Sequence, residues 1–105
     1  MGAEWAVVVG SGINALGVVR SLGQAKVAVA VVTRNNSGPA VQSRFCKCHF
    51  LIDDYKNLPE FLLSVAQQIG GRPVLFLTEE ESVWVVSENR DKLAAYFRFS
   101  LASHE

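Results

Sequence analysis

Six residues near the amino terminus have the spacing of a phosphate-binding turn. The run from Gly10 to Ala15 reads G-S-G-I-N-A and matches the dinucleotide fingerprint G-x-G-x-x-G/A. In such a turn Gly10 and Gly12 would permit a tight bend and a close backbone approach, with the amino end of the next helix facing a phosphate. A tight strand-to-helix turn at the centre of a sheet also needs glycine without any ligand, so a purely structural role stays open.

A dinucleotide site also needs a group for the ribose at the end of the second strand, and this position is unusual here. The acidic residue that binds the ribose hydroxyls is missing, and Thr33 and Arg34 stand in its place. An arginine at this point suits the 2′-phosphate of NADP. The candidate residues of an NADP or nucleotide site are therefore Gly10, Gly12, Ala15, Thr33 and Arg34.

Three consecutive carboxylates, Glu79 to Glu81, follow the fourth expected strand. They could act as acids or bases at the mouth of the sheet, but a catalytic carboxylate would need a partner that the sequence does not identify. A helix start with Thr78 and Glu81 as a capping box explains all three through the helix dipole. We prefer this second interpretation. Ser11 has no recognisable histidine and aspartate partners, which argues against a hydrolase nucleophile.

The segment from Cys46 to His49 reads C-K-C-H and invites comparison with a metal site. It supplies too few ligands at an unsuitable spacing. In a regular strand both cysteines would face one way and His49 the other. The sequence therefore predicts buried thiols without a metal.

The elements that must position these residues alternate between strand and helix. Strands are expected at residues 5–9, 27–33, 48–52 and 73–77. Helices are expected from Ile13 to about Ala25, at 40–44, from Asn57 (with Glu60 in a capping box) to Ile69, from Thr78 to about Glu88, and after Asn89. This order predicts a three-layer αβα Rossmann-like domain of the α/β class, with a mainly parallel sheet of about four strands. Ligands of such sheets bind at the carboxyl ends of the strands, where the strand order switches.

Length and charge restrict the function classes. The chain has 105 residues, enough for a single domain, and ten basic residues balance ten acidic ones. This balance gives no electrostatic support for binding nucleic acid or a membrane surface. Apolar runs such as 27–32 are too short to span a bilayer, no secretory signal is evident, and two cysteines make no disulfide framework. The expected setting is cytoplasmic.

A longer stretch than the fingerprint points to a particular family. Residues 7–23 read V-V-V-G-S-G-I-N-A-L-G-V-V-R-S-L-G and resemble the start of ATP-grasp carboxylate–amine ligases, most closely the D-aspartate ligase group. Three further stretches agree in order and spacing: S-R-F-C at 43–46, P-V-L-F-L-T at 73–78 and S-E-N-R-D-K-L at 87–93. The resemblance covers nearly the whole chain, although its motifs define a fold and are not catalytic.

The resemblance implies that the chain is a pre-ATP-grasp domain, which forms one wall of a substrate pocket and is not catalytic by itself. In these ligases ATP and magnesium bind between two later lobes, which activate a carboxylate as an acyl phosphate, and those lobes are expected to lie outside this chain. Carried over by position, the substrate-binding residues are Ser11, Gly12, Ile13 and Asn14, with Thr78 and Glu79 as weaker candidates. The turn of this family does not bind a nicotinamide dinucleotide.

The missing lobes are then the expected partners. The surface facing them should expose apolar side chains, for which we expect Trp84, Tyr96, Phe97 and Phe99, and should allow self-association of the isolated chain. Two hypotheses thus remain open: a substrate-wall domain of an ATP-dependent ligase, with no cofactor bound by this chain alone, and a stand-alone NADP- or nucleotide-binding module.

Overall fold

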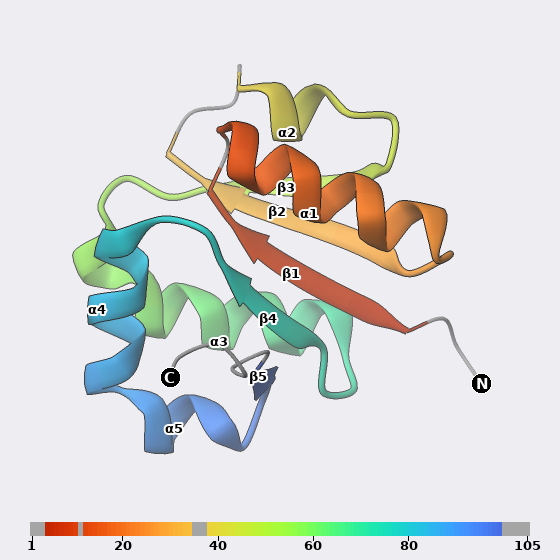
Figure 1. The fold of residues 1–105 in the computed structure, drawn as a ribbon. Coiled ribbons are helices and arrows are strands. Elements are labelled where there is room, and N and C mark those ends of the chain that lie inside the picture. Colours follow the sequence, from red (N-terminus) through yellow and green to blue (C-terminus); the bar gives the residue numbers. More distant parts are fainter. Residues whose placement is uncertain (1–3, 11, 35–37, 100–105) are drawn as a thin grey trace.

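Five parallel strands form one sheet in the order β3-β2-β1-β4-β5, in a computed structural model that describes residues 4–10, 12–34 and 38–99 (Figure 1). The strands are β1 (Trp5–Val9), β2 (Ala28–Thr33), β3 (Cys46–Leu51), β4 (Val74–Leu77) and β5 (Arg98–Phe99). The helices are α1 (Ile13–Gln24), α2 (Pro39–Gln42), α3 (Leu58–Ile69), α4 (Glu80–Glu88) and α5 (Arg90–Ala94), with a 3₁₀ turn η1 (Tyr55–Asn57) before α3. The expected α/β class with helices on both faces of the sheet is confirmed.

Two apolar cores explain why the sheet is covered on both faces. Strands β1 and β2 are apolar and almost wholly buried, as expected for the centre of a parallel sheet. Helices α1 and α2 cover one face, and α3, α4 and α5 cover the other (Figure 1). The first core contains Val8, Ala15, Val19, Val29, Val31 and Ala40. The larger core on the opposite face includes Val7, Val9, Leu58, Leu62, Leu93 and Phe97.

The chain order places a topological switch beside β1. From β1 the chain moves outward to β2 and β3, and it then returns to β4 and β5 on the other side of β1. The carboxyl ends of β1 and β4 therefore lie side by side although residues 10 to 73 separate them in sequence. This is the position at which open parallel sheets bind ligands.

Strand β3 begins at Cys46, two residues earlier than expected, and contains an irregularity. Cys46 pairs with Val29 and Cys48 pairs with Ala30, so Lys47 is an extra residue in the register. Cys46 consequently packs against the core under α1 and α2, whereas Cys48 packs against the core under α3. The expectation that both cysteines share one face was wrong, because a bulge shifts the two-residue alternation by one.

Both thiols are only partly exposed and have little thiolate character at neutral pH. Burial raises the pKa of Cys46 and of Cys48, and the neighbouring Cys48 raises the pKa of Cys46 further. The Cys46 thiol donates to the Cys48 carbonyl oxygen at 3.2 Å. Within residues 4–10, 12–34 and 38–99, no three side chains of histidine, cysteine, aspartate or glutamate gather in a way that could hold a metal ion.

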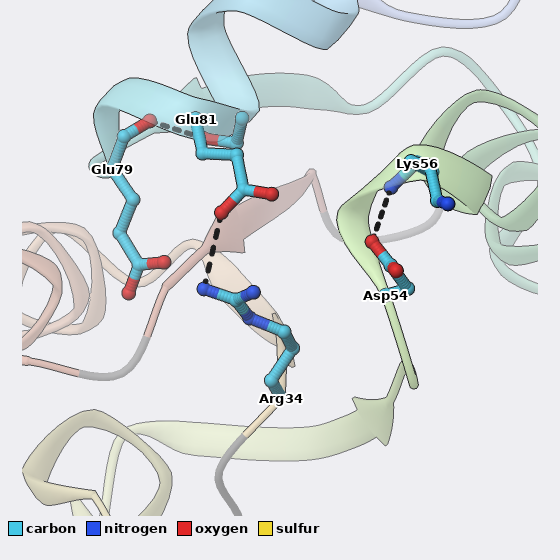
Figure 2. Close-up of polar contacts among 6 residues, drawn as sticks. Arg34, Asp54, Lys56, Glu79 and Glu81 are labelled. Atoms are coloured by element: carbon cyan, nitrogen blue, oxygen red, sulfur yellow. Dashed lines mark hydrogen bonds and ion pairs between the residues drawn. The ribbon is translucent and has the colours of Figure 1, made fainter.

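The expected helix caps are not formed by the side chains that the sequence suggested. Asn57 is the last residue of η1, and its side chain forms no capping hydrogen bond to α3. The capping side chain in this segment is Asp54, which accepts from the Lys56 backbone N–H at 2.9 Å at the start of η1 (Figure 2). The Asn89 side chain donates backward to the Val85 carbonyl at 2.9 Å. Thr78 does not cap α4 either, and the residue at its N-cap position is Glu79. The two capping boxes were therefore wrong.

The carboxyl-terminal segment also departs from expectation. The short strand β5 was not anticipated, and it brings Phe97 into the core with 0% exposure. Phe97 was thus wrongly expected on the surface. Phe99 is partly buried beside Arg90, whose guanidinium lies 5.1 Å from the ring centre, while Trp84 is 65% exposed and Tyr96 is exposed. In the described part of the chain no helix is long and apolar enough to cross a membrane.

Lys26 ends α1 in a conformation that usually requires glycine. Its φ is 66°, its N–H donates to the Gly23 carbonyl at 3.0 Å, and the Val27 N–H donates to the Leu22 carbonyl at 3.0 Å. These are the two hydrogen bonds of a Schellman motif, in which the left-handed residue is most often glycine.

Replacement of Lys26 by glycine is expected to stabilise the protein. The Lys26→Gly variant removes the steric cost of a β-carbon at positive φ, and we expect the free energy of unfolding to rise by about 0.5–1 kcal/mol. Urea unfolding followed by circular dichroism measures the change. Lys26→Ala is the matched control, because it removes the charge and keeps the β-carbon, and an equal gain in both variants would contradict this explanation.

Candidate functional site

The candidate site lies at the carboxyl ends of β1, β2 and β4, where short hydrogen bonds hold three chain segments together. The Gly10 N–H donates to the Val32 carbonyl at 2.8 Å. The Val9 carbonyl accepts twice from Thr78, from its backbone N–H at 3.1 Å and from its hydroxyl at 2.7 Å. Thr78 therefore connects β4 to β1 by hydrogen bonds and does not cap a helix. Its side chain has a structural role at the edge of the site.

Gly10 permits a close approach of the turn between β4 and α4. It is buried and has a φ of 126°, a conformation that residues with a β-carbon rarely adopt. A methyl group here would overlap with the Thr78 hydroxyl oxygen and would lie 3.2 Å from Cγ and Oε2 of Glu79. Of the residues expected at the site, Thr78 and Glu79 are thus brought directly against the glycine turn.

The start of α1 is open beside this turn. Gly12 occupies the N-cap position, no described side chain caps the helix, and its first turn contains no acidic residue. Apart from its chain neighbours, no atom of the described residues lies within 4 Å of the point where a β-carbon on Gly12 would be. The first backbone N–H groups of a helix have no partner inside it. An uncapped start of this kind favours a negatively charged group of a ligand.

The other candidate residues of the turn have different surroundings. The Ile13 side chain is 73% exposed and Asn14 is exposed, so both are available to a ligand or a partner. Ala15 is fully buried in the core beneath α1, where its small side chain allows the helix to approach the sheet. Ser11 lies outside the described residues.

Arg34 reaches across the end of the sheet toward the turn between β4 and α4. Its guanidinium nitrogen lies 3.3 Å from the Glu81 carboxylate, and its guanidinium carbon lies 4.3 Å from the centre of the Tyr55 ring. Figure 2 shows this ion pair, with the Glu79 carboxylate on the same side of the turn. Thr33, the other candidate of this pair, is buried with 1% exposure. Arg34 is therefore engaged with an acidic side chain, and Thr33 is not at the surface.

Tyr55 belongs to the site and was missed by the sequence analysis. It is fully buried, and in the described part of the chain its hydroxyl has no hydrogen-bond partner. Burial is the main cause that raises its pKa well above the ordinary value, and the nearby Glu79 carboxylate raises it further although the two groups do not meet hydrogen-bond geometry. The signal in the sequence is an aromatic residue in a polar segment directly after β3, at the same edge as the glycine turn.

The site thus presents binding groups of both signs. The uncapped start of α1 is positive in character, and the carboxylate of Glu79 lies at the neighbouring Gly10. Arg34 is a cation at this edge, and the carboxylate of Glu81 already neutralises it. Glu79 forms no ion pair among the described residues, so its charge would repel a phosphate placed at the turn.

Comparison with known proteins adds no family to this description. A scan of the chain against protein-family models gives no match, and a search among curated proteins gives none.

Proposed function

We propose that this chain forms one wall of the substrate pocket of an ATP-dependent carboxylate–amine ligase, and that its glycine turn binds an amino acid. The observation that carries the proposal is that two groups of opposite charge character, the start of α1 and the Glu79 carboxylate, lie at the glycine turn. The uncapped start of α1 suits the carboxylate of the amino acid, and the Glu79 carboxylate suits its ammonium group. The resemblance of residues 7–23 to the start of ATP-grasp ligases supplies the reaction class.

In this proposal the chain binds and orients the substrate but performs no chemical step. ATP and magnesium belong to the two lobes that the resemblance implies, and these lobes are the proposed partners in a cytoplasmic enzyme. The exposed side chains of Val83 and Trp84 on α4, and of Tyr96 after α5, provide apolar area for contacts with such lobes or with a second copy.

An NADP- or nucleotide-binding module is the rival function, and Arg34 is the residue that favours it. Arg34 stands at the end of β2, where a 2′-phosphate would bind. Its guanidinium is already paired with Glu81 and stacked on Tyr55, so a phosphate would have to displace that ion pair. The pyrophosphate would also lie against Glu79 at the glycine turn. These two features favour the amino acid over the dinucleotide.

Amide chemical shifts test the proposal, because they detect weak binding at each residue. A panel of α-amino acids is expected to shift the amides of Gly12, Ile13, Asn14 and Glu79, with a dissociation constant of about 1–10 mM for one wall of a pocket. The N-acetylated form of the best ligand keeps the carboxylate and loses the ammonium group, so it should bind at least about fivefold more weakly.

Two variants of the same turn make this experiment specific. Glu79→Gln should weaken amino-acid binding by about fivefold, because it removes the charge that faces the ammonium group. Glu80→Gln should leave binding unchanged, because Glu80 is exposed on the first turn of α4 and Glu79, not Glu80, supplies the nearest carboxylate to Gly10. Equal effects of the two variants would contradict the role given to Glu79.

A reading frame continuing for some hundreds of residues beyond Glu105 would support the ligase assignment, and a stop codon there would contradict it.

A further inference from the structure

A pocket lies at the amino-terminal edge of the sheet, opposite the candidate substrate site. It forms where the turn between α1 and β2 meets the residues that lead into β3, and its volume is about 610 Å³. Pockets of this size hold small molecules. Three of the side chains that line it are cations, Lys26, Arg44 and Lys47. Arg20 and Arg44 line a second hollow directly beside it.

Among the described residues these cations have no acidic partners. None of the ion pairs among the described residues involves Lys26, Arg44 or Lys47, and no carboxylate lines the pocket. Glu4 is near, since its backbone carbonyl accepts from the Ala28 N–H at 3.0 Å. Its carboxylate is bound to Arg98 at 3.2 Å instead. The pocket is therefore a local excess of positive charge in a chain whose net charge is zero.

The three cations are exposed side chains on a well-packed stretch of backbone, and one aromatic ring lies beside Arg44. The Phe45 ring packs so closely against α1 that a methyl group on Gly23 would overlap with it. The Arg44 guanidinium lies 5.0 Å from the centre of this ring, a distance at which the ring and the cation attract one another. Lys47 is the extra residue of the β3 bulge. Arg44 and Lys47 thus project from a well-packed segment.

Lys26 is the least expected of the three. It occupies the left-handed position of the Schellman motif, where a β-carbon is unfavourable and glycine is common. A residue that violates a local rule of this kind is often a functional one. Its side chain lines the pocket together with Arg44 and Lys47, so a charge at this position has a use that glycine could not supply.

We infer that this pocket binds a small molecule with several adjacent negative charges, an oligophosphate group. Three unpaired cations around one hollow match two or three linked phosphates, and arginine presents a planar set of donors that suits phosphate oxygens. The Phe45 ring is already covered by Arg44 and packed on Gly23, so the pocket recognises charge without stacking a base. The site is independent of the proposed function, because it uses other residues at the opposite edge of the sheet.

Titration with inorganic tripolyphosphate, pyrophosphate, phosphate and citrate tests this inference. At low ionic strength we expect tripolyphosphate to shift the amides of Lys26 to Ala28 and of Arg44 to Lys47, with affinity falling in the order tripolyphosphate, pyrophosphate, phosphate. Binding should weaken steeply with added salt, because the contacts are exposed charges. Citrate should bind at least about tenfold more weakly than tripolyphosphate, and equal binding would overturn the assignment to phosphate.

Variants separate this pocket from a general attraction to cations. Arg44→Gln and Lys26→Gly should each weaken tripolyphosphate binding by about fivefold. Lys26→Gly is expected to fold at least as stably as the parent chain, so its loss of binding cannot come from unfolding. Lys56→Gln is the control, because Lys56 is exposed near the opposite edge. Undiminished binding in Arg44→Gln, or an equal loss in Lys56→Gln, would overturn the inference.

Discussion

The Gly10→Ala substitution is expected to lower the free energy of unfolding by about 3–5 kcal/mol. Alanine disfavours the φ of 126°, and its methyl group would overlap with the Thr78 hydroxyl oxygen, which is itself held at 2.7 Å from the Val9 carbonyl. The overlap occurs between neighbouring strand ends that cannot separate without losing the hydrogen bonds of Thr78. Small domains have a total stability of only about 5–15 kcal/mol, so much of the variant should be unfolded. Urea unfolding measures the loss.

The neighbouring glycine provides the matched control for this prediction. Gly12 has a φ of −82° and open space around the position of a β-carbon, so Gly12→Ala should cost less than about 1 kcal/mol. A double-mutant cycle with Thr78→Ala separates the two causes, because it removes the overlap and keeps the unfavourable φ. The double variant should be more stable than the sum of the single changes indicates. Similar losses for Gly10→Ala and Gly12→Ala would show that the strand ends are not packed as described.

Alkaline pH is expected to destabilise the protein through Tyr55. Burial first, and then the Glu79 carboxylate, raise the pKa of its hydroxyl in the folded state. The unfolded chain therefore loses this proton first, near pH 10, and stability falls above that pH by about 1.4 kcal/mol per unit. The loss continues until the folded state also releases the proton.

The Tyr55→Phe variant isolates this contribution from the other groups that titrate above pH 10. At pH 7 it should be as stable as the parent chain or more stable by up to about 1 kcal/mol, because the buried hydroxyl has no hydrogen-bond partner within the described residues. Between pH 10 and 12 the difference in stability should grow in favour of phenylalanine. Urea unfolding at several pH values gives both numbers. A loss of more than 1 kcal/mol at pH 7 would instead mean that the hydroxyl donates to Glu79.

The sequence predicts those parts of the fold that depend on local patterns. The continuous apolar run of Trp5–Val9 predicts a central strand, because a strand buried on both faces is apolar throughout. The helical spacing of apolar residues from Ile13 to Gln24 predicts a helix with one buried face. The short strand β5 has no such signature, and its existence depends on pairing with β4, which brings Phe97 into the core. The extra residue Lys47 in β3 is equally invisible, because only the register with β2 reveals it.

The candidate site is predictable in position but not in its interactions. Parallel topology places Gly10, Thr78 and Glu79 at one edge, and the structure brings them into direct contact. The capping motif at Thr78 was misleading, because a local hydrogen bond to the helix competes with a stronger tertiary one to Val9. The approach of Tyr55 to Arg34 joins η1 to the end of β2, and no local pattern encodes such a contact.

The central claim is that the glycine turn binds an amino acid and not a dinucleotide. Calorimetric titration of the isolated chain with NADPH tests this claim most directly. The charge of Glu79 at Gly10 and the pairing of Arg34 with Glu81 predict no binding tighter than about 1 mM, while the amino-acid shifts at Gly12 to Asn14 persist in the presence of NADPH. One-to-one binding below about 10 µM, abolished by Arg34→Gln, would contradict the account and establish the nucleotide-binding function in its place.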